Sequence, residues 1–136
     1  MNIKNILVID DEANFCAMIK INLESAGHGF KVDTALSAKE GFDKIAQQRY
    51  DIIFLDIIMP KIEGHEALQQ IKKMCDTPVV VMSAYLPPQR KSAITNAGAY
   101  SCLEKPIELD HLIQLIGEIE KYEAMKKSLK PGTAST

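Results

Sequence analysis

The sequence predicts an α/β domain in which five parallel strands form one sheet with helices on both faces. Two observations support this fold class. First, five short apolar runs, rich in β-branched residues, have the composition of buried strands. Second, each run precedes a segment with helical character, and this strict alternation is typical of a doubly wound parallel sheet. A length of 136 residues suits a single domain of this kind.

The first strand is expected over residues 3–9 and the first helix over residues 12–26. Apolar residues recur on one face of this helix at the spacing that one turn requires. They are Phe15, Met18, Ile19 and Leu23.

The second strand is expected over residues 30–34. Ser37 and Glu40 then form the capping-box pattern that begins a helix, which is predicted to end near Arg49. Its inward-facing residues are expected to be Phe42, Ile45 and Ala46.

The third strand, residues 51–55, is followed directly by a lone carboxylate, Asp56. A charge among apolar neighbours costs free energy unless it has a partner, so Asp56 is expected to have a function. After a turn through Met59 and Pro60, the third helix is expected over about residues 64–74.

The fourth strand is expected over residues 79–82, followed by a helix that a Pro-Pro pair opens and that ends near Gly98. The fifth strand is expected over residues 100–104, and the last helix begins near Glu108. Its inward residues are expected to be Leu109, Leu112, Ile113, Ile116 and Ile119.

Polar residues follow four of the five strands, where ligands gather in open parallel sheets. They are Asp10, Asp11 and Glu12 after the first strand, Asp56 after the third, Ser83 after the fourth and Lys105 after the fifth. If the first and third strands are neighbours, the carboxylates converge and favour a divalent cation such as Mg²⁺. Ser83 and Lys105 would add donors for a tetrahedral anion. Each residue alone also fits a helix cap, a turn or an exposed strand exit.

The ordered sequences VIDDE (8–12), LDIIMPKIEG (55–64), VMSA (81–84) and EKP (104–106) resemble the receiver domain of two-component response regulators. The resemblance covers about residues 3–120. It implies a flavodoxin-like fold with strand order 2-1-3-4-5 and five helices.

By this resemblance Asp56 is the phosphoacceptor, and its carboxylate attacks a phosphohistidine on a sensor histidine kinase or histidine phosphotransfer protein. Asp11, Asp56 and the backbone carbonyl of Ile58 would hold Mg²⁺, with Asp10 acting largely through water. Catalysis would then be positioning and charge neutralisation.

The resemblance also assigns roles around the phosphoryl group. Lys105 would pair with Asp56 and later with a phosphoryl oxygen, and Ser83 would bond another oxygen and draw its loop inward. The small Ala84 would leave room for the phosphoryl group. The bond between Lys105 and Pro106 resembles the cis peptide of the family.

The sequence departs from the family pattern at the position of the switch residue, an aromatic side chain that turns inward on activation in the family. Cys102 stands where the family usually has Tyr or Phe, and Tyr100 is expected on the same face of a regular strand. Ile58 and Tyr85 occupy positions that tune hydrolysis in the family. Because an apolar Ile58 cannot hydrogen-bond an attacking water, self-dephosphorylation is predicted to be slow.

Composition and charge bear on the binding partners and the cellular location of the protein. The net charge of −2 gives no basic footprint, so direct nucleic-acid binding is not expected. The sequence shows neither a membrane-spanning stretch nor a signal peptide, which predicts a cytoplasmic protein. Three cysteines without a close-spaced pair indicate small buried side chains, with neither a zinc site nor disulfides.

The expected domain covers residues 1–120, with residues 121–136 as a helix overhang and a flexible tail or linker stub. If the last helix reaches residue 127, it is longer than the sheet is deep, and residues 131–136 are expected to be disordered.

The function expected is a phosphorylation-controlled switch, which changes the surface around strands four and five for an effector protein or for an output domain outside this chain. A phosphorylation-dependent homodimer is a further candidate. Apart from assisting its own phosphorylation and slow dephosphorylation, the protein is not expected to be an enzyme. Three alternatives are an aspartyl phosphatase, a flavin-binding domain and a pseudo-receiver that binds partners without phosphorylation. The adjacent Asp10 and Asp11 disfavour the first two, and the intact acidic set disfavours the third.

Overall fold

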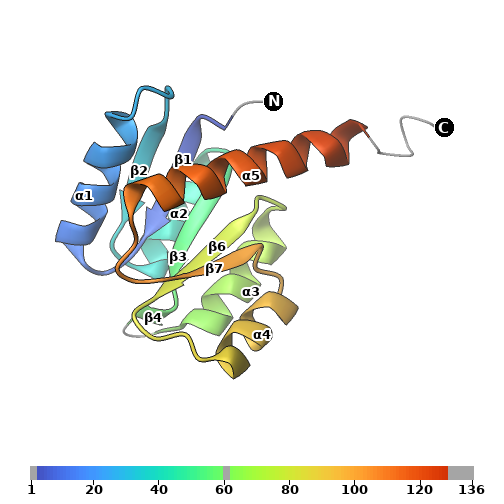
Figure 1. Ribbon diagram of the computed structural model, residues 1–136. Coiled ribbons are helices and arrows are strands. Elements are labelled where there is room, and N and C mark those ends of the chain that lie inside the picture. The colour runs from blue at the N-terminus through green and yellow to red at the C-terminus, as the bar shows by residue number, and fades with distance from the viewer. Residues whose placement is uncertain (1–2, 60–61, 129–136) are drawn as a thin grey trace.

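Five parallel strands form the central sheet of the computed structural model, which describes residues 3–59 and 62–128 (Figure 1). The order across the sheet is β2-β1-β3-β6-β7, which confirms the expected order 2-1-3-4-5 of the five main strands. The strands are β1 (Asn5–Ile9), β2 (Lys31–Ala35), β3 (Ile52–Asp56), β6 (Val79–Ser83) and β7 (Ser101–Glu104).

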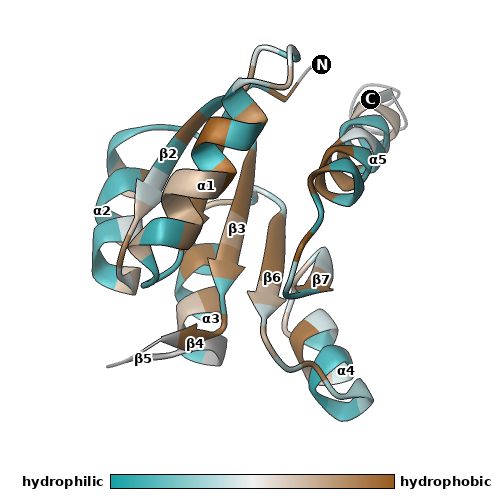
Figure 2. Cartoon of the chain, turned by 60° about the vertical axis from the view of Figure 1, so that its left-hand side comes forward, coloured by the Kyte–Doolittle hydropathy of each residue, from teal (hydrophilic) through white to brown (hydrophobic). Residues whose placement is uncertain are grey.

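Two helical layers cover the sheet. The helices α1 (Ala13–Glu24) and α5 (Leu109–Ser128) pack on one face, and α2 (Ala38–Gln47), α3 (Gly64–Met74) and α4 (Pro88–Asn96) pack on the other. Alternate residues of each strand enter the two core clusters, so that Ile53 and Leu55 face α2–α4 while Ile52 and Phe54 face α1 and α5. Because both faces are buried, β3 and β6 are hydrophobic along nearly their whole length (Figure 2).

A small antiparallel hairpin that the sequence analysis did not predict follows β3. It pairs β4 (Ile58–Met59) with β5 (Ile62–Glu63), where only a turn was expected. Strands of two residues are too short to show the alternation by which a strand is predicted.

The boundaries of the main elements differ from expectation by one or two residues. In two helices, the side chains that face the core also differ from those expected. In α1, Met18 was expected in the core but is 46% exposed, whereas Cys16 is buried. In α2, Ala46 was expected inward but is exposed, whereas Gly41 is buried. In each case more than one set of residues fits helical spacing, and the docking of the helix on the sheet selects one.

The predicted cap of α2 is confirmed. The Ser37 Oγ accepts a hydrogen bond from the Glu40 backbone N–H at 3.1 Å, and Glu40 Oε1 accepts one from the Leu36 N–H at 2.8 Å. Both side chains therefore satisfy backbone donors at the start of the helix.

The last helix, α5, continues to Ser128 and exposes Tyr122 and Met125 near its end. The predicted disorder of residues 131–136 lies outside the described residues. Among the described helices, none combines the length and apolar character that crossing a membrane requires.

We predict that Gly41→Ala destabilises the protein by about 1–2 kcal/mol, as overpacking outweighs the better helix propensity of alanine. A Cβ at Gly41 would lie 2.5 Å from Cδ1 and 2.9 Å from Cγ1 of the fully buried Ile9. The matched control is Gly117→Ala in α5, where a Cβ meets nothing within 4 Å and alanine should stabilise the helix. Urea denaturation of both variants tests this, and stabilisation by Gly41→Ala would contradict it.

Candidate functional site

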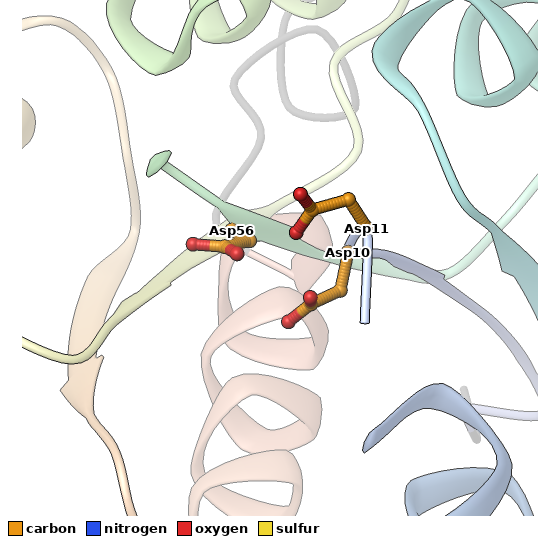
Figure 3. A group of neighbouring side chains, drawn as sticks. All are labelled: Asp10, Asp11 and Asp56. Atoms are coloured by element: carbon orange, nitrogen blue, oxygen red, sulfur yellow. The ribbon is translucent and has the colours of Figure 1, made fainter. Parts of the chain in front are cut away.

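Three aspartates form an acidic cluster at the carboxyl edge of the sheet (Figure 3). Asp10 and Asp11 follow β1, and Asp56 ends the neighbouring strand β3. Each offers one carboxylate oxygen, and these oxygens all lie within 4.8 Å of one another. Asp10 is fully buried and Asp56 is 5% exposed, whereas Asp11 is exposed.

Local backbone hydrogen bonds orient the two buried carboxylates. Asp10 Oδ1 accepts from the Glu12 N–H at 2.9 Å, and Asp56 Oδ1 accepts from the Ile58 N–H at 3.0 Å. The second oxygen of each carboxylate, Oδ2, faces the ammonium group of Lys105. The strand ends thus hold these side chains in fixed directions.

Lys105 forms the expected ion pair with Asp56, but it lies closer to Asp10 and Glu12. Its Nζ lies 2.7 Å from Asp10 Oδ2 and 3.2 Å from Glu12 Oε1, but 3.7 Å from Asp56 Oδ2. The physical reason is burial, because Asp10 is the carboxylate most fully removed from water and gains most from a cation. One ammonium nevertheless cannot balance four neighbouring carboxylates.

Alongside burial, the excess of negative charge contributes to a raised pKa of Asp56. Burial raises the pKa of Asp56 to about 6, and the negative charges of Asp10 and Asp11 add to the rise. The Ile58 N–H and Lys105 act in the opposite direction on this pKa. Three hard oxygen donors at this separation suit a divalent cation such as Mg²⁺, whose charge would favour the ionised carboxylates.

Ser83 lies at the same edge, but its hydroxyl is engaged within its own loop. It is fully buried, and its Oγ lies 3.2 Å from both the backbone nitrogen and the carbonyl oxygen of Tyr85, accepting from the first and donating to the second. Asp56 is in register with Met82, so Ser83 extends one residue beyond it on the adjacent strand. Ala84 and Tyr85 are exposed beside it.

Two further predicted positions border the cluster. The side chain of Ile58 is 56% exposed, and its backbone nitrogen contacts Asp56. The bond between Lys105 and Pro106 is cis, as the resemblance implied, and Pro106 is exposed.

Tyr100 and Cys102 were expected on one strand face, but they lie on opposite faces of the sheet. Tyr100 packs with the core cluster of α1 and α5 and forms an edge-to-face contact with Tyr122, at 5.5 Å between ring centroids. Cys102 packs with the other cluster, near Thr95 of α4. The expectation assumed a regular strand, whereas β7 begins only at Ser101, after Tyr100.

Phe15 was expected only in the core, yet the structure brings its ring to the site. Lys105 Nζ lies 4.2 Å from the centroid of that ring. An aromatic residue one turn after an acidic run gave no signal of this contact, because Lys105 is 90 residues away in the sequence.

Two of the three cysteines differ from the expected burial, since Cys16 is buried but Cys75 and Cys102 are only half-buried.

Comparison with known proteins agrees with the geometry. The family model described as the response regulator receiver domain matches residues 6–117. Response regulator ArlR of Staphylococcus aureus is 30% identical over 121 residues, which are 89% of this chain and 54% of that protein. The chain therefore spans about half the length of the curated relatives it matches.

Solved structures of response regulators also superpose on this chain. A two-component response regulator from Clostridium difficile superposes with a TM-score of 0.82 at 30% identity, covering 87% of this chain and 96% of that chain. A CheY-like receiver domain protein from Methanospirillum hungatei JF-1 superposes with a TM-score of 0.82 at 28% identity, covering 91% and 99%.

We predict that Asp56→Asn raises the free energy of unfolding at pH 7 by about 1–3 kcal/mol in buffer without divalent cations. The amide keeps an oxygen for the Ile58 N–H but removes a buried charge. Because its pKa is raised on folding, Asp56 binds more protons in the folded protein than in the unfolded chain between about pH 4 and about pH 6. The free energy of unfolding of the wild type should therefore fall relative to that of the variant as pH rises through this window. Urea denaturation across this range measures the difference, and an Asn variant that is less stable at pH 7 would contradict it.

Proposed function

Because this chain belongs to the response regulator receiver domain family, we propose that it is a phosphorylation-controlled signalling switch with Asp56 as its phosphoacceptor. The observation that carries the proposal is the cluster of three carboxylate oxygens within 4.8 Å, with the Lys105 ammonium beside it. The arrangement supports the proposal because the carboxylate that would act as the nucleophile lies at one edge of the sheet together with oxygen donors for a cation and a positive charge.

In the proposed reaction, a carboxylate oxygen of Asp56 attacks the phosphorus of a phosphohistidine on a sensor histidine kinase or phosphotransfer protein. The phosphorus–nitrogen bond breaks as the aspartyl phosphate forms, and the electron pair leaves with the imidazole. Asp11, Asp56 and the Ile58 carbonyl would hold Mg²⁺, with Asp10 acting largely through water. When bound, the cation neutralises the charge of the phosphoryl oxygens.

Two side chains would change partners once Asp56 is phosphorylated. Lys105, 3.7 Å from Asp56 Oδ2, would turn to a phosphoryl oxygen. Ser83 would exchange its bonds to Tyr85 for another phosphoryl oxygen, and the loop after β6 would move inward past the small Ala84. The surface of β6, β7 and their helices would thereby change.

That surface is where we place the output of the switch. Its partner would be an effector protein or an output domain outside this chain, and phosphorylation-dependent pairing of two copies is a second mode of output. Residues 1–120 would act as the receiver, with residues 121–136 as an overhang or linker stub. We place the protein in the cytoplasm, with direct binding of neither nucleic acid nor membrane.

The first test is the intact mass of the protein after incubation with Mg²⁺ and acetyl phosphate. We expect a gain of one phosphoryl group in the wild type, and no gain without Mg²⁺ or in Asp56→Ala, because the acceptor oxygen and the cation are then missing. If the wild type takes up no phosphoryl group and also fails to bind beryllofluoride, the proposal is wrong and a pseudo-receiver is favoured.

The second test concerns the lifetime of the aspartyl phosphate. We expect slow hydrolysis in the wild type, since the exposed Ile58 side chain offers no hydrogen bond to an attacking water. Ile58→Asn should speed the loss of phosphate about 3- to 10-fold, as expected for one added hydrogen bond. The decay of the phosphorylated mass gives the rate.

The matched control is Ile21→Asn, which makes the same change at another exposed isoleucine, on α1. It should leave the decay rate unchanged. Decay in the wild type as fast as that of chemotaxis-type receivers, or equal rates in the wild type and Ile58→Asn, would contradict the role of Ile58.

A further inference from the structure

We propose that Phe15 is a positioning residue for Lys105, holding the ammonium at the acidic cluster so that it can reach a phosphoryl oxygen on Asp56. The inference rests on the proposed function, because it concerns the group that would stabilise the transferred phosphoryl. It starts from the position of Nζ, 4.2 Å from the centroid of the Phe15 ring. A cation over an aromatic face is attracted by the ring quadrupole, more strongly where water is excluded, and the Lys105 side chain is 14% exposed.

The hydrogen bonds of Lys105 explain why an aromatic ring is useful here. An ammonium has three N–H donors, and in the described part of the chain Lys105 donates to Asp10 at 2.7 Å and to Glu12 at 3.2 Å. Its distance of 3.7 Å from Asp56 Oδ2 is too long for a hydrogen bond. The ring attracts the charge through its face without replacing either carboxylate acceptor. One donor therefore remains for a phosphoryl oxygen.

The sheet order explains why Lys105 needs this hold. Lys105 follows β7, whereas Asp10 and Asp11 follow β1, and both β3 and β6 lie between those two strands. A lysine side chain with four rotatable methylenes must therefore cross the sheet edge to reach its partners. Holding such a chain in one geometry costs conformational entropy, which contacts at its end must offset.

The segment from the end of β1 to the first turn of α1 provides those contacts. The Glu12 N–H binds Asp10, the Glu12 carboxylate binds Lys105, and Phe15 lies three residues later, in the first turn of the helix. The ring is half-buried against the core cluster of α1 and α5, which fixes its orientation. The ring and the two carboxylates that contact the ammonium thus belong to one short segment, residues 10–15.

The test compares phosphorylation by acetyl phosphate in Phe15→Leu, Phe15→Tyr and the wild type. Leucine keeps an apolar side chain but has no ring, so the initial rate should fall about 3- to 10-fold, whereas tyrosine should keep the wild-type rate. Phe30→Leu is the matched control, because Phe30 is also half-buried against the same cluster. It should leave the rate unchanged.

A double-mutant cycle separates positioning from packing. If Phe15 acts through Lys105, then adding Phe15→Leu to a Lys105→Met variant should change the rate no further. A wild-type rate in Phe15→Leu, a faster one, or an equal loss with and without Lys105 would overturn the inference.

A readout without phosphorylation tells the two proposals apart. The ε-methylene protons of Lys105 should resonate upfield in the NMR spectrum of the wild type, because the ring lies against the end of this side chain. They should move downfield in Phe15→Leu but not in Phe30→Leu. If the wild type takes up no phosphoryl group, the proposed function fails, and the NMR shifts still decide whether Phe15 holds Lys105. Unshifted ε-methylene protons in the wild type would refute that hold whatever the phosphorylation result.

Discussion

The charge balance around Asp10 is the constraint on which the rest of the structure depends. Its carboxylate is fully buried, and a buried carboxylate without a partner would cost several kcal/mol of stability. The Glu12 N–H and the Lys105 ammonium supply those partners, from the start of α1 and from the end of β7. Asp56 accepts a hydrogen bond from the Ile58 N–H and shares the same ammonium at a longer distance, so the carboxylates at the site outnumber its cation. In the proposed function, a divalent cation would bind at this excess of negative charge, and the phosphoryl group would be transferred to Asp56 beside it.

The fold creates this constraint by burying the sheet on both faces. Two helical layers cover both faces of β1 and β3, and the acidic cluster lies at the carboxyl edge of these strands, where ligands bind in open parallel sheets. The same burial raises the pKa of Asp56, and it gives nearby charges and dipoles more influence than they would have in water. In the proposed function, well-oriented carboxylates at this edge would act together with a cation and the Ser83 hydroxyl.

At the proposed switch position, this chain departs from the pattern that its resemblance to receiver domains implies. Tyr100 contacts Tyr122 of α5, whereas Cys102 faces α4 on the opposite side of the sheet. The short thiol of Cys102 cannot sweep through the space that a tyrosine would, so the output is proposed to depend more on the loop after β6 than on a rotating aromatic ring.

The sequence by itself determined the alternating elements, the strand order through its family motifs, and the residues at the strand ends. Each of these follows from local periodicity or from a motif within a few residues. Only the tertiary structure decided that Met18 lies outside the core, that Lys105 lies closer to Asp10 than to Asp56, and that Phe15 lies under the ammonium. These outcomes depend on the docking of α1 and on contacts between segments about 90 residues apart, for which neither helical spacing nor a local motif carries a signal.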